Sequence, residues 1–291
     1  MKSKKNYSMK ILILGGTGMV GHVLIKKLSR KNNLFAMIRE KNNLQVSGFF
    51  DEIINKDKCL FIDNINDYSK VSEMIKNLSP DLIINCIGVI KQRDDISNIL
   101  NMIKINSLLP HMLSKICIKN NIKLIHLSTD CVFSGKKGNY NESDIPDPVD
   151  KYGESKLLGE IDDGFSLTIR TSFIGKELFN KKSFLEWVIS EKNNQVEGFD
   201  NAIYSGLTTN AFADIIQDII SNHSSLNGVW QVSSDSISKF ELIKLIDKKF
   251  NLNLKINQNS SFICDRSLNS SKFRSKTNIK IPSWEIMIND L

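Results

Sequence analysis

The stretch Ile11–Gly21, ILILGGTGMVG, decides the fold. Its first four residues form a continuous apolar run, which is typical of a strand buried on both faces of a sheet. Gly15, Gly18 and Gly21 follow in the spacing G-x-x-G-x-x-G, and a helical apolar pattern then runs to Leu28. A strand, a glycine-rich turn and a helix in this order favour a dinucleotide-binding unit.

Each glycine of this loop has a separate task. Gly15 permits a tight turn, Gly18 lets the backbone approach a phosphate, and Gly21 lets the helix pack close to the sheet. The N–H groups and the dipole at the helix start then hold a pyrophosphate. A glycine-rich turn without a ligand is the alternative. Cofactor contacts are expected from the whole loop, namely Gly15, Thr17, Gly18, Met19, Val20 and Gly21.

Short apolar runs alternate with helical patterns after this unit. Strands are predicted at Leu34–Ile38, Cys59–Ile62, Leu82–Cys86, Lys123–Leu127 and Ser166–Ile169. Helices are predicted around residues 71–78, in a long region ending near Asn121, and around Lys151–Ile161. The alternation predicts an α/β fold class, with a Rossmann-type doubly wound parallel sheet that carries helices on both faces.

The second half of the chain is less regular. It offers a helical stripe over Ala211–Ile220, a short strand at Val229–Val232 and a helix at Phe240–Phe250. These pieces are too few for a second doubly wound sheet. We therefore expect an N-terminal tail over residues 1–8 and an NAD(P)-binding Rossmann domain over 9–175. Residues 176–291 would form mainly a smaller substrate-binding lobe, with some elements returning to the first domain.

Composition sets further bounds. The chain has 291 residues, 41% hydrophobic and 24% charged, and no apolar run approaches the ~20 residues that a membrane helix needs. Five cysteines without a C-x-x-C motif give no disulfide framework and no zinc site. The formal net charge is +7, but the lysines are scattered rather than clustered. We expect a cytoplasmic protein with no metal site, no nucleic-acid partner and no membrane partner.

The end of the second strand bears on the choice between NADP and NAD. A carboxylate there would hydrogen-bond the ribose of NAD and repel a 2′-phosphate, whereas this chain has Arg39. An arginine can grip the 2′-phosphate as a bidentate donor, so NADPH is favoured over NADH. A solvated surface arginine is the alternative, and the adjacent Glu40 complicates the assignment.

Two further strand ends fit a nucleotide groove. Asp63 and Asn64 close the third strand, where an acid can accept from an adenine amino group. Cys86, Ile87 and Gly88 close the fourth, where a glycine lets the backbone come near the cofactor ribose. Either segment could instead be an ordinary turn.

A catalytic pattern follows the fifth strand. That strand ends in Ser128-Thr129-Asp130, and Tyr152 and Lys156 stand four residues apart further on, one turn apart on one helix face. A free tyrosine has a pKa of ~10, and a nearby ammonium favours the phenolate and lowers that pKa. His126 lies close by, but we expect it to be a packed strand residue rather than part of a hydrolase triad.

The chain resembles the extended short-chain dehydrogenases/reductases, and among these the dTDP-4-dehydrorhamnose reductase family of sugar-nucleotide reductases. The matching segments are GGTGMVG (15–21), STDCVFSG (128–135), YGESKLLGE (152–160) and IRTSFIG (169–175). The resemblance implies that Tyr152 donates a proton to the reduced carbonyl oxygen and that Lys156 binds the cofactor ribose and tunes Tyr152. It further implies that Thr129 orients the carbonyl, while Thr171 and Ser172 line the nicotinamide pocket.

The sequence departs from the family's pattern where the sugar would bind. Cys131 stands where the family usually has an aromatic residue, and Phe173 where it often has tryptophan. Tyr204, Ser205 and Gly206 align loosely with the family's substrate loop, although a plain surface turn is about equally consistent. The resemblance thus implies a nucleotide-linked sugar as the substrate and leaves the hexose open.

The resemblance predicts NADPH-dependent reduction of a nucleotide-linked 4-keto-6-deoxysugar, in deoxysugar or surface polysaccharide biosynthesis. Two alternatives stay open: a sugar-nucleotide epimerase of the same extended family, and a non-catalytic NADP-binding regulatory subunit. A dehydratase is disfavoured because Cys131 replaces the glutamate of its Thr-Asp-Glu pattern. The family often forms dimers, so a homodimer is a further possibility.

Overall fold

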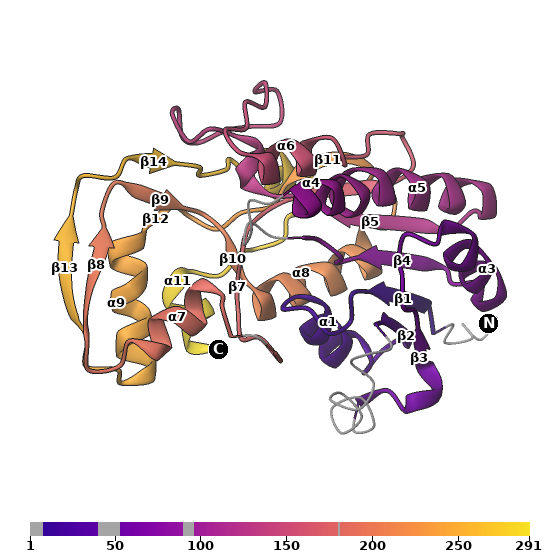
Figure 1. The fold of residues 1–291 in the computed structure, drawn as a ribbon, viewed down its shortest axis with the longest axis horizontal. Coiled ribbons are helices and arrows are strands. Elements are labelled where there is room, and N and C mark those ends of the chain that lie inside the picture. The colour runs from indigo at the N-terminus through magenta and orange to yellow at the C-terminus, as the bar shows by residue number, and fades with distance from the viewer. Residues whose placement is uncertain (1–7, 40–52, 90–95, 180) are drawn as a thin grey trace.

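The computed structural model describes residues 8–39, 53–89, 96–179 and 181–291, and Figure 1 shows a larger α/β body joined to a smaller lobe. Among these residues, seven parallel strands form the main sheet in the order β11-β6-β5-β4-β1-β2-β3. The strands are β1 (Lys10–Leu14), β2 (Asn33–Ile38), β3 (Cys59–Phe61), β4 (Leu82–Asn85), β5 (Lys123–Leu127), β6 (Leu167–Arg170) and β11 (Gly228–Gln231). The predicted doubly wound parallel sheet is confirmed.

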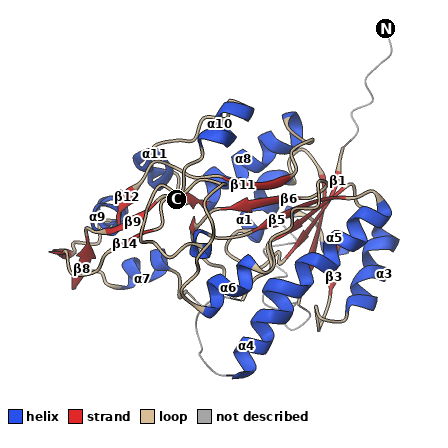
Figure 2. Cartoon of the chain, turned by 90° about the horizontal axis from the view of Figure 1, so that it is seen from above, coloured by secondary structure: helices blue, strands red, loops and turns tan. Residues whose placement is uncertain are grey.

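The helices cover both faces of this sheet because its strands are apolar on both sides. Ile11 and Ile13 of β1 pack with α1 (Gly21–Leu28) and α8 (Thr209–Asn222). Leu12 and Leu14, which point to the opposite face, pack with α3 (Tyr68–Leu78) and α5 (Leu109–Asn120). In Figure 2 the sheet runs between α8 on one side and α5 and α3 on the other.

The strand order reverses at β1, which lies between β2 and β4. The chain passes from β1 outward to β3 on one side and from β4 outward to β6 on the other. The loops that leave the carboxyl ends of β1 and β4 therefore diverge, and a crevice opens between them. In an open α/β sheet, this switch point is where ligands bind.

The remaining helices of the larger body lie after β4 and β5. The helix α4 (Ile96–Met102) continues through a π-helical segment, Ile103–Leu108, into α5. The helix α6 covers Lys151–Leu157 and is shorter than the predicted 151–161. It ends in tight turns, in which Gly159 and Glu160 donate backbone hydrogen bonds to residues three positions earlier, and Glu160 then pairs with a buried arginine of β6.

The smaller lobe consists of short elements from the C-terminal segment. Its helices are α7 (Phe184–Ser190), α9 (Lys239–Phe250) and α11 (Trp284–Asn289), whereas α10 (Ser271–Thr277) packs beside β11 of the main sheet. Its strands form the pairs β13-β8 and β10-β7 and the three-stranded sheet β12-β9-β14. They are β7 (Phe173–Ile174), β8 (Gln195–Phe199), β9 (Ala202–Tyr204), β10 (Leu207–Thr208), β12 (Ile237–Ser238), β13 (Lys255–Asn259) and β14 (Cys264–Asp265).

Two elements after residue 176 belong to the main sheet and its helix layer. The strand β11 pairs with β6 as the outermost strand. The helix α8 packs against α1, where Lys27 and Asp214 form an ion pair of 2.7 Å. The predicted N-terminal tail, residues 1–8, falls almost entirely outside the described residues.

Candidate active site

A continuous groove follows the carboxyl ends of the central strands. It consists of two cavities, of about 810 and 1080 Å³, that share Gly18, Cys86, Ile87 and Gly88 as lining residues. The first cavity extends to Arg39 after β2, and the second extends to Tyr152 and Lys156 on α6. The groove therefore joins the glycine loop to the predicted catalytic helix.

The glycine loop presents its backbone to this groove. Gly15 has a φ of +79°, and its N–H donates to Met37 O at 3.1 Å. A Cβ at Gly21 would overlap the carbonyl oxygen of Gly15, so only glycine lets α1 begin this close to the loop. Thr17 and Gly18 line the first cavity, and Gly18, Met19 and Val20 line the second. Such a cradle fits the pyrophosphate of a dinucleotide.

The predicted adenine end of the groove is only partly assembled from the expected residues. Arg39 lines the cavity with an exposed side chain, beside Met37 and Ile38. Asp63 and Asn64 are exposed and do not line it, whereas Ile62 and Ile65 do. The strand β3 already ends at Phe61, and the Asn64 side chain accepts from the Asn66 N–H at 3.0 Å in the turn before α3.

Asn106, in the π-helical segment, holds the loop after β4 in place. Its side-chain oxygen accepts from Val89 N at 2.8 Å, and its amide nitrogen donates to Val89 O at 2.9 Å and to Ser155 Oγ at 3.0 Å. One buried side chain thus ties the loop that carries Gly88 to the helix that carries Tyr152. Sequence analysis missed Asn106 because a single asparagine in a helical pattern gives no signal.

Thr129, Tyr152 and Lys156 meet at the second cavity. The helix α6 is capped by Asp150, whose side chain accepts from Gly153 N at 2.8 Å, and this fixes the turn bearing Tyr152. Thr129 Oγ1 donates to Asp130 Oδ1 at 3.1 Å and accepts from Cys131 N at 3.2 Å, and its side chain lines the same cavity as Tyr152. Lys156 is buried, and its Nζ donates to Leu127 O at 2.5 Å. The structure therefore brings together the three residues predicted to be catalytic.

The pKa of Tyr152 differs from the expectation that the Lys156 ammonium lowers it. Burial raises the pKa of Tyr152, and the nearby Thr129 hydroxyl opposes that change only in part. Burial lowers the pKa of Lys156 to about 8, with Glu160 acting in the opposite direction. At neutral pH Tyr152 is thus a protonated phenol, the state that a proton donor requires.

The loop after β6 forms the far wall of the second cavity. Thr171, Ser172 and Phe173 all line it. Thr171 is buried, and the Phe173 ring packs edge-on against Phe212 of α8 with centroids 4.8 Å apart. Glu177 lines the same cavity, and its side-chain oxygen accepts backbone hydrogen bonds from residues 182 and 183.

The other predicted substrate residues lie behind this wall. Tyr204 is buried on β9, with its ring beside Trp284 of α11 at a centroid distance of 5.7 Å. Ser205 Oγ accepts from Leu268 N at 2.8 Å, and Gly206 O accepts from a serine hydroxyl. Ser205 and Gly206 line neither cavity of the groove, so they stabilise the lobe around Tyr204.

Cys131 lines neither cavity of the groove, and sequence analysis missed two cations, one beside Cys131 and one over Tyr204. Arg266 Nη1 lies 3.3 Å from Cys131 Sγ, and burial raises the pKa of this thiol to about 12. Lys239 Nζ lies 3.9 Å from the Tyr204 ring centroid; burial lowers its pKa to about 8, while Asp130 acts in the opposite direction. Both cations are more than 100 residues from Cys131 in the chain, and no local motif marks them.

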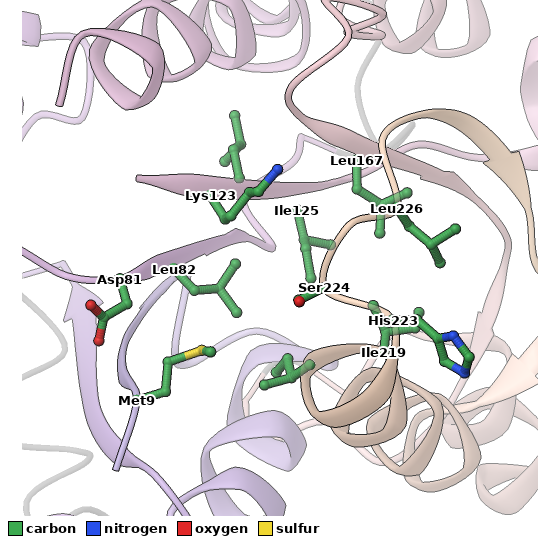
Figure 3. Close-up of a pocket in the computed structure, with 12 residues that line it drawn as sticks. Met9, Asp81, Leu82, Lys123, Ile125, Leu167, Ile219, His223, Ser224 and Leu226 are labelled. Carbon is green, nitrogen blue, oxygen red and sulfur yellow. The ribbon is translucent and has the colours of Figure 1, made fainter. Parts of the chain in front are cut away.

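A separate cavity of about 400 Å³ lies at the amino ends of the strands, away from the groove (Figure 3). Its lining is mostly apolar and includes Met9, Leu82, Ile125 and Leu167 together with the end of α8. None of the predicted site residues lines it.

His126 is a packed strand residue, as predicted. It is fully buried on β5, and its Nδ1 lies 3.1 Å from the side-chain nitrogen of Asn85 on β4. Within the described residues, no three His, Cys, Asp or Glu side chains are grouped so that they could hold a metal ion. None of the helices in those residues combines the length and apolarity needed to cross a bilayer.

Comparison with known proteins gives a match over nearly the whole chain. The family model of the RmlD substrate binding domain matches residues 9–290. A probable low-salt glycan biosynthesis reductase, Agl14, of Haloferax volcanii is 32% identical over 153 residues, covering 52% of this chain and 48% of that protein. The aligned part spans about half the length of this and other curated relatives.

Solved structures share the fold over its full extent. A hypothetical dTDP-4-dehydrorhamnose reductase from Sulfolobus tokodaii is 27% identical with a TM-score of 0.75, covering 94% of this chain and 96% of that one. The dTDP-4-dehydrorhamnose reductase of Bacillus anthracis in complex with NADP has a TM-score of 0.79 at 21% identity, covering 97% of both chains.

Proposed function

The chain belongs to the RmlD substrate binding domain family, and from this premise we propose that it is an NADPH-dependent reductase of a nucleotide-linked 4-keto-6-deoxysugar. Such a reaction would serve deoxysugar or surface polysaccharide biosynthesis. The observation that carries the proposal is the convergence of Thr129, Tyr152 and Lys156 on a groove that also contains the glycine loop. A nicotinamide, when bound, supplies the hydride.

The groove offers contacts for the whole length of a dinucleotide. The glycine loop residues Gly15, Thr17, Gly18, Met19 and Val20 would hold the pyrophosphate, with Gly21 letting α1 start close to it. Arg39 would bind the 2′-phosphate, and this preference for NADPH over NADH is part of the proposal. The ribose and nicotinamide would lie against Cys86, Ile87, Gly88, Lys156, Thr171 and Ser172.

The catalytic residues act on the keto oxygen of the sugar. Tyr152 donates the proton, because its buried phenol stays protonated at neutral pH. Thr129, which lines the same cavity as Tyr152, orients the same oxygen. The Lys156 ammonium lies one helical turn away and offsets the negative charge that develops on Tyr152 during transfer.

The sugar and its nucleotide would lie toward the smaller lobe. Phe173 lines that end of the groove, and we propose that Cys131, which lines neither cavity, and the buried Tyr204 shape it from behind. Lys239 and Arg266 bring positive charge to the same place and suit the anionic part of a nucleotide-linked sugar. We propose that residues 9–175, with α8 and β11, bind the cofactor and that the rest of 176–291 binds the substrate.

A panel of nucleotide-linked 4-ketosugars, assayed by loss of NADPH absorbance, tests the proposal. Consumption of one NADPH per ketosugar supports a reductase. Interconversion of sugars without net NADPH consumption would identify an epimerase instead. Binding of NADPH without turnover of any sugar in the panel would favour a non-catalytic cofactor-binding subunit.

A further inference from the structure

A buried ion pair lies directly behind the catalytic helix. Glu160, just after α6, accepts from Arg170 Nε at 2.8 Å and from Arg170 Nη2 at 2.7 Å. The two side chains are 7% and 6% exposed. Removing two charges from water costs about as much as the pair regains, so an apolar pair would stabilise the fold equally well. Stability alone therefore does not account for a charged pair at this place.

The same carboxylate is connected to the catalytic strand end. Ser128 Oγ donates to Glu160 Oε1 at 2.7 Å, and Ser128 N donates to Ile169 O at 2.7 Å. Ser128 immediately precedes Thr129, which lines the second cavity together with Tyr152. Glu160 thus fixes the backbone from which Thr129 projects, and Arg170 fixes Glu160.

Lys156 and Glu160 are held by consecutive residues of one strand end: Lys156 Nζ donates to Leu127 O, and Glu160 Oε1 accepts from Ser128 Oγ. The ionisable groups acting on Lys156 from the packed elements are Cys86 at the end of β4, His126 on β5 and Glu160 after α6. Burial raises the pKa of the Cys86 thiol to about 12 and lowers the pKa of His126 far below its ordinary value. Both are therefore neutral near pH 7, as is Tyr152 on Lys156's own helix. Among the described residues that act on Lys156, Glu160 supplies the negative charge.

We propose that Glu160 is a positioning residue of this site: held by Arg170, its carboxylate keeps Lys156 in the ammonium form and anchors Ser128 beside Thr129. The expected effect of Glu160 on turnover rests on the proposed reductase function. Its effect on the charge of Lys156 is independent of that function and can be measured in the protein without substrate or cofactor.

The direct test is an NMR titration of ε-¹³C-labelled lysine, with the Lys156 signal assigned by its loss in Lys156→Met. In the unmutated protein the signal should titrate near pH 8. In Glu160→Gln the midpoint should fall by about one pH unit, the low end of the effect of a neighbouring opposite charge. At pH 8 the charged fraction of Lys156 would then drop from about one half to about one tenth.

Arg170→Gln provides a variant with the opposite sign. Loss of the guanidinium leaves the Glu160 carboxylate less neutralised, so the Lys156 midpoint should rise. If the ion pair only stabilised the fold, Glu160→Gln and Arg170→Gln would shift the Lys156 midpoint in the same direction. Glu154→Gln is the matched control on α6, because Glu154 pairs with Lys151 at the surface and should leave the midpoint unchanged.

Glu160→Gln strands a buried guanidinium and can prevent folding, so Glu160→Gln with Arg170→Gln removes both charges at once. That double variant should also lower the midpoint, by less than Glu160→Gln does, because Glu160 acts on Lys156 more strongly than Arg170 does. If an active ketosugar is found, the alkaline limb of the pH profile of kcat should move to lower pH in Glu160→Gln. An unchanged Lys156 midpoint in the folded charge-free variant would overturn the inference. A lowered midpoint without turnover of any ketosugar would instead count against the reductase function alone.

Discussion

The cofactor end and the substrate end of the groove are built in different ways. The cofactor end comes largely from one contiguous stretch, Ile11–Gly21, and offers backbone groups whose positions follow from glycine geometry. The proposed substrate end depends on side chains from segments far apart in the chain: Phe173 lines the groove, and Arg266 contacts Cys131 nearby. Backbone recognition suits a constant ligand, whereas side-chain recognition can change from one sugar to another without disturbing the sheet.

The largest effect should come where the two ends meet. Tyr152→Phe removes only the hydroxyl, so turnover should fall by roughly 100- to 10,000-fold, the usual contribution of a positioned general acid. NADPH affinity should stay close to that of the unmutated protein, because the glycine loop is untouched. Ketosugar-dependent NADPH oxidation and cofactor fluorescence measure the two quantities. Near-normal turnover would remove Tyr152 from the mechanism.

The second prediction changes only the substrate end. Cys131→Tyr combined with Phe173→Trp should alter the ranking of 4-ketosugars by kcat/KM, by about 1–3 kcal/mol or roughly tenfold to a few hundredfold. The dissociation constant of NADPH should not move. If the ranking of ketosugars is unchanged while NADPH binding weakens, Cys131 and Phe173 belong to the cofactor end and not to the substrate end.

The third prediction changes only the cofactor end. Arg39→Asp would remove the proposed charge-assisted contact with the 2′-phosphate, worth ~1.5–3 kcal/mol, and add repulsion, so NADPH should bind roughly tenfold to a hundredfold more weakly. NADH affinity should change little, and sugar ranking should be preserved. The measurement is a pair of dissociation constants for each protein. Equal affinity of the unmutated protein for NADH and NADPH would contradict the role given to Arg39.

The fourth prediction concerns the sheet that supports both ends. Burial lowers the pKa of His126 in the folded state, so protonation favours the unfolded chain. Stability is complete above the unfolded pKa of ~6.5 and should fall by about 1 kcal/mol between pH 6.5 and 5.5. Urea titrations of the unmutated protein and of His126→Gln check this, since the variant should lose less stability over that interval. Equal losses would assign the pH dependence to other groups.

Sequence analysis recovered the parts that local chemistry specifies. The main strands before β7 appear within about one residue of their predicted bounds, because both-face burial forces continuous apolar runs. The glycine loop, Thr129, Tyr152 and Lys156 line one groove. They could be predicted because strand ends and helical spacing are local patterns in the sequence. Asp63 and Asn64 are exposed and do not line the groove, and β3 ends one residue earlier than predicted.

The substrate end was harder to predict because its contacts are long-range. The strands β7, β9 and β10 are only two or three residues long, too short for a periodicity to appear. Lys239 begins an ordinary amphipathic helix, and Arg266 follows the two-residue strand β14, so neither differs locally from a surface cation. Asn106 lies in a π-helical segment, and no residue pattern in the sequence predicts such a segment.

The return of β11 to the main sheet has a consequence for folding and for truncation. β6 pairs with β5 on one side and with β11 on the other, and β11 reaches it only after residues 176–227 have been made. A fragment ending at residue 175 would leave the whole outer flank of β6 unpaired, with a row of free N–H and C=O groups that can recruit a strand from another molecule. It would also uncover the apolar face of α1 that α8 covers. A shortened chain with the complete glycine motif but no β11 should therefore aggregate. During synthesis on the ribosome, the main sheet can be completed only after residues 176–227 and β11 have emerged.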